Sequence, residues 1–161
     1  MEKTLTELYL SRAENELVAA EVLFKTSKSE TLQKEDFKLE KSFTFYSSVI
    51  SHSYYCIFYA AKAILISQGI KTDAPNVHLK TIQAFEKHMV RTGKLDADLL
   101  RVYKTIIVRA DDLLGIFAME KGKRGRFTYK RLPQANVEPA QESMDQASFF
   151  FKNIRKVLSE K

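Results

Sequence analysis

Four polar or aromatic residues with helical spacing are the first candidates for chemistry in this sequence. They are separated by three, four and three positions, which puts them on one face of a helix: His52, Tyr55, Tyr59 and Lys62. Aromatic planes with polar tips suit a base or a nucleotide. The same spacing also fits core tyrosines with satisfied hydroxyls beside a lysine that snorkels out to solvent. The spacing alone favours this second, structural interpretation.

A second candidate is the charged pair Arg109 and Asp112, three positions apart and one step from the apolar stripe of their predicted helix. An intrahelical ion pair at this spacing contributes a few tenths of a kcal/mol. The alternative is a charged pair that lines a groove. The spacing again favours the structural interpretation.

The third candidate is the basic segment, residues 121–131, which reads "KGKRGRFTYKR" and contains no acid. The formal net charge of the chain is +6, and this segment holds six bases, so the rest of the chain is balanced. Such a segment can neutralise phosphates while its rings stack on a base, or it can be a solvated surface loop. Its bases and rings are Lys121, Lys123, Arg124, Arg126, Phe127, Tyr129, Lys130 and Arg131.

Several kinds of chemistry find no support in the sequence. None of the three histidines has a glutamate three residues before it, as a di-iron bundle requires, and Cys56 is the single cysteine. No glycine-rich phosphate loop is present. We therefore expect no metal site and no cofactor, and we interpret Cys56 as an inert core thiol. One cysteine, and an acidic N-terminus unlike a signal peptide, indicate a cytoplasmic protein.

The elements that would position these residues are predicted to be helices. Glycine (5) and proline (3) are scarce, and apolar residues recur every three or four positions. This pattern predicts long helices over about 3–26, 43–68, 99–117 and 140–158, and a short one over about 77–91, capped by Asn76. Gly69 is the natural stop of the second helix. The prediction is an all-α, up-and-down helical bundle of four long helices plus one short helix, in a single domain covering residues 1–161.

The helix over 43–68 is apolar on nearly every side, which fits a membrane span or a central position. Its uninterrupted run, residues 54–66, has 13 residues and contains Lys62, whereas a span needs about 20. We therefore predict the most buried helix of a bundle and no membrane. Its alanines, Ala60, Ala61 and Ala63, would let another helix come close, so we also predict a homodimer with this part near the contact.

The stretch "SYYCIFYAAKAILISQGI" (53–70) resembles the second-helix signature of small stand-alone prokaryotic HEPN-domain proteins (higher eukaryotes and prokaryotes nucleotide-binding). His78 and Phe85 resemble the histidine and phenylalanine of that family's next helix. "VRADDL" (108–113) and "DQASFFFKNI" (145–154) resemble its last two helices, so the resemblance covers about residues 5 to 158. The residues that match the second-helix signature are Tyr54, Tyr55, Phe58, Ala60, Ala61, Lys62 and Ala63.

The resemblance implies an antiparallel helical bundle, commonly a homodimer, that associates with a nucleotide or RNA. It also implies a toxin–antitoxin pair with a minimal nucleotidyltransferase as the partner. Many members of the family are ribonucleases in which a histidine follows an arginine by four to six residues. No arginine of this chain has a histidine at that distance, so ribonuclease activity is not expected.

Three functions remain open at this stage. The leading one is a non-catalytic HEPN-type module that binds a nucleotide, RNA or a nucleotidyltransferase. The second is a ribonuclease with a substituted active site, whose catalytic candidates are Arg109, Asp112 and His78. The third is a protein-interaction module with no nucleic-acid role. The expected nucleotide-binding groove consists of His52, Tyr55, Tyr59, Lys62, His78 and Arg109.

Overall fold

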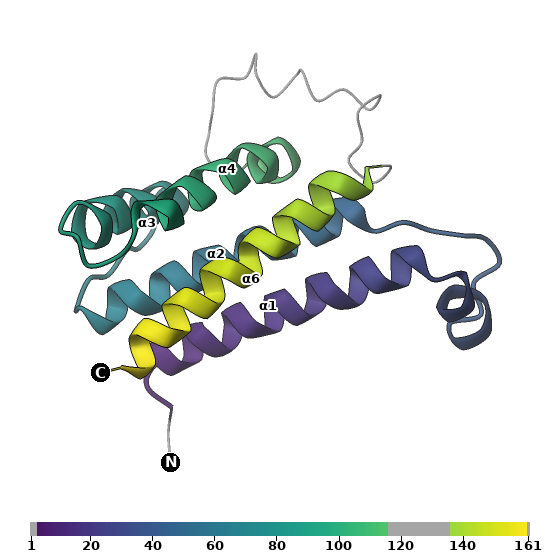
Figure 1. Cartoon of the computed structure of the whole chain (residues 1–161), viewed down its shortest axis with the longest axis horizontal. Coiled ribbons are helices and arrows are strands. Elements are labelled where there is room, and N and C mark those ends of the chain that lie inside the picture. The colour runs from purple at the N-terminus through teal and green to yellow at the C-terminus, as the bar shows by residue number, and fades with distance from the viewer. Residues whose placement is uncertain (1–2, 116–135, 161) are drawn as a thin grey trace.

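Four long helices and one short helix pack together in the computed structural model, which describes residues 3–115 and 136–160 (Figure 1). The described residues contain no strand, so the all-α prediction is confirmed. The helices are α1 (Leu5–Lys28), α2 (Tyr46–Ser67), α3 (Val77–Phe85), α4 (Ala97–Leu114) and α6 (Val137–Ser159). A single π-helical turn lies between α1 and α2, η1 (Leu32–Asp36), and another lies between α3 and α4, η2 (Glu86–Val90).

The centre of the bundle is α2, which packs against α1, α3, α4 and α6. In Figure 1, α6 crosses in front of α2, with α1 on one side and α4 on the other. Most α2 side chains are buried, because neighbours surround an apolar helix on several sides. Cys56 is among them, as expected, and burial raises the pKa of its thiol.

Local sequence signals mark several of the helix ends. Thr4 and Glu7 form a capping box at the start of α1, and the Asp96 side chain accepts a hydrogen bond from the Asp98 amide at the start of α4. Gly69 follows α2 with φ +76°, a left-handed conformation that glycine adopts without strain. Asn76 is the N-cap residue of α3, as predicted, although its side chain makes no capping hydrogen bond.

Among the described residues, α2 is the one helix long and apolar enough to cross a membrane by length and composition. The sequence analysis, which counted an apolar run of 13 residues, therefore underestimated the length of this apolar helix. However, 67% of the apolar window of α2 is buried inside the bundle. A central helix of a bundle passes the same test, so this composition is weak support for a membrane span.

The three alanines expected to lie near a dimer contact are buried within the single chain. Ala60, Ala61 and Ala63 are each 0% exposed within the single chain. Their small side chains let helices of the same chain approach α2 closely, so these three side chains are not themselves available to a second subunit. A homodimer itself stays a prediction, without an assigned interface.

Candidate functional site

One side of α2 is half-buried and faces solvent between α1 and α3. It carries His52, Tyr55 and Tyr59, each of intermediate exposure, while most of the rest of the helix is buried. The helical spacing recognised in the sequence therefore corresponds to a real face of α2. We call this face, with the α1 and α3 side chains that contact it, the tyrosine face.

Three tyrosine rings form a ladder on the tyrosine face. The rings of Tyr9 from α1 and Tyr59 stack with centroids 6.2 Å apart, and those of Tyr55 and Tyr59 stack at 6.1 Å. Arg12 lies against this ladder: its guanidinium carbon is 4.4 Å from the Tyr59 ring centroid, and Nη2 donates a hydrogen bond of 2.8 Å to the Tyr59 hydroxyl. The ladder presents aromatic surface beside an exposed cation, which is the chemistry that a nucleobase and its phosphate require.

His52 is held by a residue that the sequence did not single out. Its Nδ1 lies 2.5 Å from Oε2 of Glu16, on α1. Glu16 and Arg12 are four residues apart on the same helix, so both point toward α2 from successive turns. No pattern in the sequence links these α1 residues to α2, because the link depends on how the two helices pack.

Lys62 does not snorkel into solvent, so that part of the structural interpretation is wrong. It is 9% exposed, and its Nζ donates a 2.8 Å hydrogen bond to the Thr72 carbonyl. The ammonium also lies 5.2 Å from the Tyr9 ring centroid and 5.9 Å from that of Phe58. Lys62 thus anchors the α2–α3 connection to the tyrosine face through a buried charged hydrogen bond.

His78, on α3, lies between Tyr54 and the tyrosine face. Its Nδ1 is 2.7 Å from the Tyr54 hydroxyl, and its ring stacks on Phe58 at 4.3 Å. Burial, and then the positive charge of Lys62, lower the pKa of His78. Burial is also the main cause of the raised pKa of Tyr54, to which the charge of Asp111 contributes.

The lowered pKa of His78 predicts a loss of stability in acid. The unfolded chain binds the proton more readily, so the contribution of neutral His78 is present above about pH 6.5 and declines as the pH falls below that value. His78→Gln should therefore lose less stability than the wild type between pH 7.5 and pH 5.5. Urea unfolding followed by circular dichroism at both pH values measures this. Equal losses in the two proteins would contradict the prediction.

The buried carboxylate of "VRADDL" is Asp111 rather than the candidate Asp112. Asp111 is 3% exposed, whereas Asp112 is of intermediate exposure. Burial, together with the charge of Asp111, raises the pKa of Asp112. Asp111 directly follows Ala110, which belongs to the apolar stripe of the helix. This neighbour was the one signal in the sequence that Asp111 would be buried.

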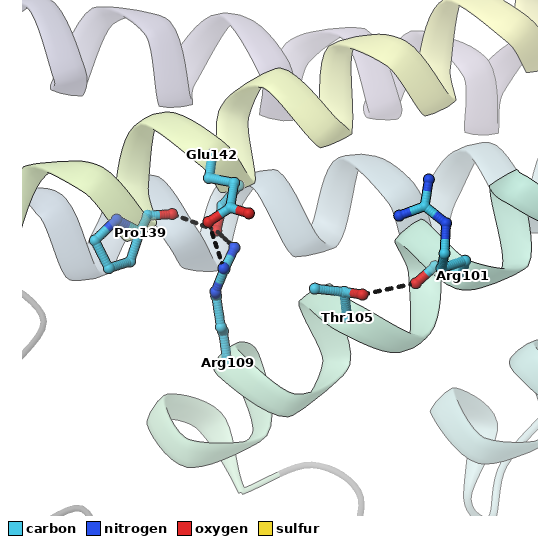
Figure 2. Close-up of polar contacts among 6 residues, drawn as sticks. Arg101, Thr105, Arg109, Pro139 and Glu142 are labelled. Carbon is cyan, nitrogen blue, oxygen red and sulfur yellow. Dashed lines mark hydrogen bonds and ion pairs between the residues drawn. The ribbon is translucent and has the colours of Figure 1, made fainter.

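Arg109 belongs to another interface. Figure 2 shows it reaching from α4 to Glu142 on α6, where Nη2 donates to Oε2 at 2.6 Å. Its Nη1 also donates to Oγ of Ser143 at 3.3 Å. Ser143 in turn donates to the Pro139 carbonyl at 2.7 Å. The predicted ion pair with Asp112 is therefore wrong, and Arg109 instead ties α4 to the first turns of α6.

The structure thus divides the candidates into two groups. It brings together His52, Tyr55, Tyr59, Lys62 and His78 around the tyrosine face. Arg109 makes its described contacts with α6, away from the contacts of His78 with α2. Within residues 3–115 and 136–160, no group of three or more histidine, cysteine or acidic side chains could hold a metal ion. The basic segment, 121–131, lies outside the described residues.

Comparison with known proteins gives one distant similarity. No family model matches the chain. A curated protein of Methanocaldococcus jannaschii, named "Putative toxin MJ0142", is 30% identical to it over 84 residues. The alignment covers 49% of this chain and 55% of that protein, so the chain spans about half the length of this curated relative. The similarity is to a protein named as a toxin, and that name mentions no HEPN domain.

Proposed function

We propose that this chain is a non-catalytic helical module of the HEPN type, which binds a nucleotide or RNA at the tyrosine face. The observation that carries the proposal is the ladder of Tyr9, Tyr59 and Tyr55 with Arg12 beside it. A single-stranded base stacks on such rings, and the guanidinium pairs with a phosphate. Half-burial fixes the rings while leaving part of each in contact with solvent.

The absence of catalysis is part of this proposal. Metal-free cleavage of RNA needs a positioned group that takes up and gives back a proton. The described contacts of His52 are with Glu16 on α1, and those of His78 are with Tyr54 and Phe58 on α2. Arg109, which would stabilise the charge that develops on phosphate, contacts Glu142 on a different interface. The geometry therefore supports binding better than the ribonuclease alternative.

The proposed setting is a toxin–antitoxin-like pair in the cytoplasm, with a nucleotidyltransferase as the partner protein. The distant similarity to an archaeal protein named as a toxin supports this setting. The HEPN-like order of sequence features supports the identity of the partner. A nucleotidyltransferase encoded beside this chain, and its co-purification with the chain, would test the pairing.

Substitutions on the tyrosine face should separate stacking from charge. Tyr55→Ala should weaken binding of a single-stranded RNA by roughly 1–3 kcal/mol, about 5- to 150-fold, because one stacking surface is lost. Arg12→Ala should instead reduce the slope of log affinity against log salt by about 0.7, because one phosphate contact is lost. Fluorescence anisotropy at several salt concentrations measures both effects.

Val108→Ala is the matched control, because Val108 is an exposed apolar residue on α4, away from the tyrosine face. It should leave affinity and salt slope unchanged. Wild-type affinity retained in both Tyr55→Ala and Arg12→Ala would remove the tyrosine face as the binding site. Cleavage of the RNA above a buffer control, abolished by Arg109→Ala, would replace the proposal with the ribonuclease alternative.

A further inference from the structure

The tyrosine face has a cation at one end and a carboxylate at the other. The guanidinium of Arg12 contacts Tyr59, and the carboxylate of Glu16 contacts His52, which lies earlier on α2. The two α1 residues are separated by one helical turn, which is about 5.4 Å along the axis. Tyr55 lies between the two contacted positions of α2, and its ring stacks on that of Tyr59. A nucleotide stacked on Tyr55 can therefore meet Arg12 with its phosphate and Glu16 with the edge of its base.

The Glu16 end of the face offers hydrogen-bond acceptors. A carboxylate only accepts, so Nδ1 of His52 is the donor in its contact with Oε2 of Glu16. Oε1 of Glu16 makes no hydrogen bond within residues 3–115 and 136–160. In a neutral imidazole that donates from Nδ1, the other nitrogen, Nε2, is an acceptor as well. The His52 side chain is 36% exposed and that of Glu16 is 18% exposed, so a ligand can reach both.

Acceptors of this kind select among bases by their exocyclic groups. Cytosine, adenine and guanine each carry an amino group, which donates. Uracil carries two carbonyls with a single N–H between them, so a carboxylate that approaches its edge also meets carbonyl oxygens. Acceptors that face one another lose their hydrogen bonds to water without replacement. The hydroxyl of Tyr55 both donates and accepts, so it does not discriminate. The charge of Glu16 also repels phosphate, which favours the Arg12 end for the backbone.

We propose that Glu16 makes the tyrosine face selective for single-stranded RNA whose bases carry an exocyclic amino group, so that uracil is disfavoured. The inference rests on the proposed function, since it needs a base stacked at Tyr55. Glu16 accepts a hydrogen bond from the amino group, and Arg12 pairs with the phosphate of the same nucleotide. Glu16 is thus a residue that determines specificity, whereas Arg12 positions the strand without reading its sequence.

Two oligonucleotides of equal length and charge test this selectivity. Fluorescein-labelled oligocytidylate and oligouridylate have rings of the same size but different edges, and each presents one kind of base in every register. Fluorescence anisotropy with the full chain at pH 8, where an imidazole is neutral, measures both affinities. The wild type should bind oligocytidylate about fivefold more tightly, the effect of one hydrogen bond. Contacts of the basic segment with phosphates would affect both oligonucleotides alike, so the ratio of affinities isolates the base edge.

Glu14→Gln is the matched control for Glu16→Gln. Both variants remove one negative charge from α1, but Glu14 is 60% exposed and its Oε1 lies 3.8 Å from Nη1 of Arg155 on α6. Glu16→Gln alone should bring the two affinities within about twofold, because its amide also donates to the uracil carbonyl. Glu16→Ala, which removes the acceptor without adding a donor, should lower the ratio too. Circular dichroism checks the helical content of each variant.

The outcomes separate this inference from the proposed function. A wild type that binds both oligonucleotides equally, or oligouridylate more tightly, overturns the selectivity and leaves the proposed function standing. The same holds if both Glu16 variants keep the wild-type ratio, or if Glu14→Gln loses it as fully as they do. A wild type that binds neither oligonucleotide overturns the proposed function and this inference with it. Tyr55→Ala should weaken binding of both oligonucleotides if bases stack there, whatever their ratio.

Discussion

Replacing Phe150 with alanine is expected to lower the free energy of unfolding by about 3–5 kcal/mol, a large share of the stability of a domain of this size. Phe150, on α6, is 0% exposed. Its ring centroid lies 5.4 Å from that of Phe85 on α3 and 5.7 Å from that of Tyr103 on α4. Truncation would remove the ring that both Phe85 and Tyr103 contact, and it would leave a cavity between α3, α4 and α6.

Urea unfolding followed by circular dichroism measures this loss, and the next residue supplies the control. Phe149 is 46% exposed, so Phe149→Ala should change the free energy of unfolding by no more than about 0.5 kcal/mol. The two variants remove the same atoms from adjacent positions and differ mainly in burial. Similar losses in both, or a loss below about 1 kcal/mol for Phe150→Ala, would contradict the packing of α6 described above.

The second large effect is expected in the basic segment, residues 121–131. If three or four of its bases contact the phosphates of a single strand, the slope of log affinity against log salt should be roughly −2 to −3. Replacing Lys123, Arg124 and Arg126 together with alanine should flatten that slope, because the phosphate contacts release fewer counterions. RNA binding measured by fluorescence anisotropy at several salt concentrations gives the slope directly.

The aromatic residues of the basic segment provide a matched comparison. Phe127→Ala and Tyr129→Ala should each weaken binding by roughly 1–3 kcal/mol per stacked base with little change in slope. Circular dichroism should show the same helical content in all these variants. No RNA binding by the wild type at low salt, or an unchanged slope in the triple variant, would show that the basic segment does not contact nucleic acid. The alternative interpretation, in which the basic segment binds an acidic protein partner, would then be favoured.

The tyrosine face and the basic segment make different predictions for the same ligand. Arg12 is one fixed cation beside stacked rings, so its loss should change the salt slope by a single contact. The basic segment carries six cations and should account for most of the salt dependence. Combining Tyr55→Ala with the triple alanine substitution would show whether the two act on one RNA strand. Losses of binding free energy that add would indicate two independent contributions.

The sequence by itself determined the helices and the position of the central one. Apolar residues spaced by three and four predicted the long helices to within a few residues, because a helix must bury one stripe of its surface. An apolar surface on nearly every side marked α2 as the centre. The spacing of His52, Tyr55 and Tyr59 predicted their common face, since side chains three and four residues apart share a side of a helix.

The partners of the polar groups were decided only by the tertiary structure. Lys62 meets the Thr72 carbonyl, Arg109 meets Glu142 and Gln33 meets Phe43. Each of these pairs joins different elements. Spacing within one helix fixes the direction of a side chain but not what faces it, which depends on how the helices cross. For the same reason the alanines of α2, which suggested a second subunit, proved to be covered by helices of the same chain.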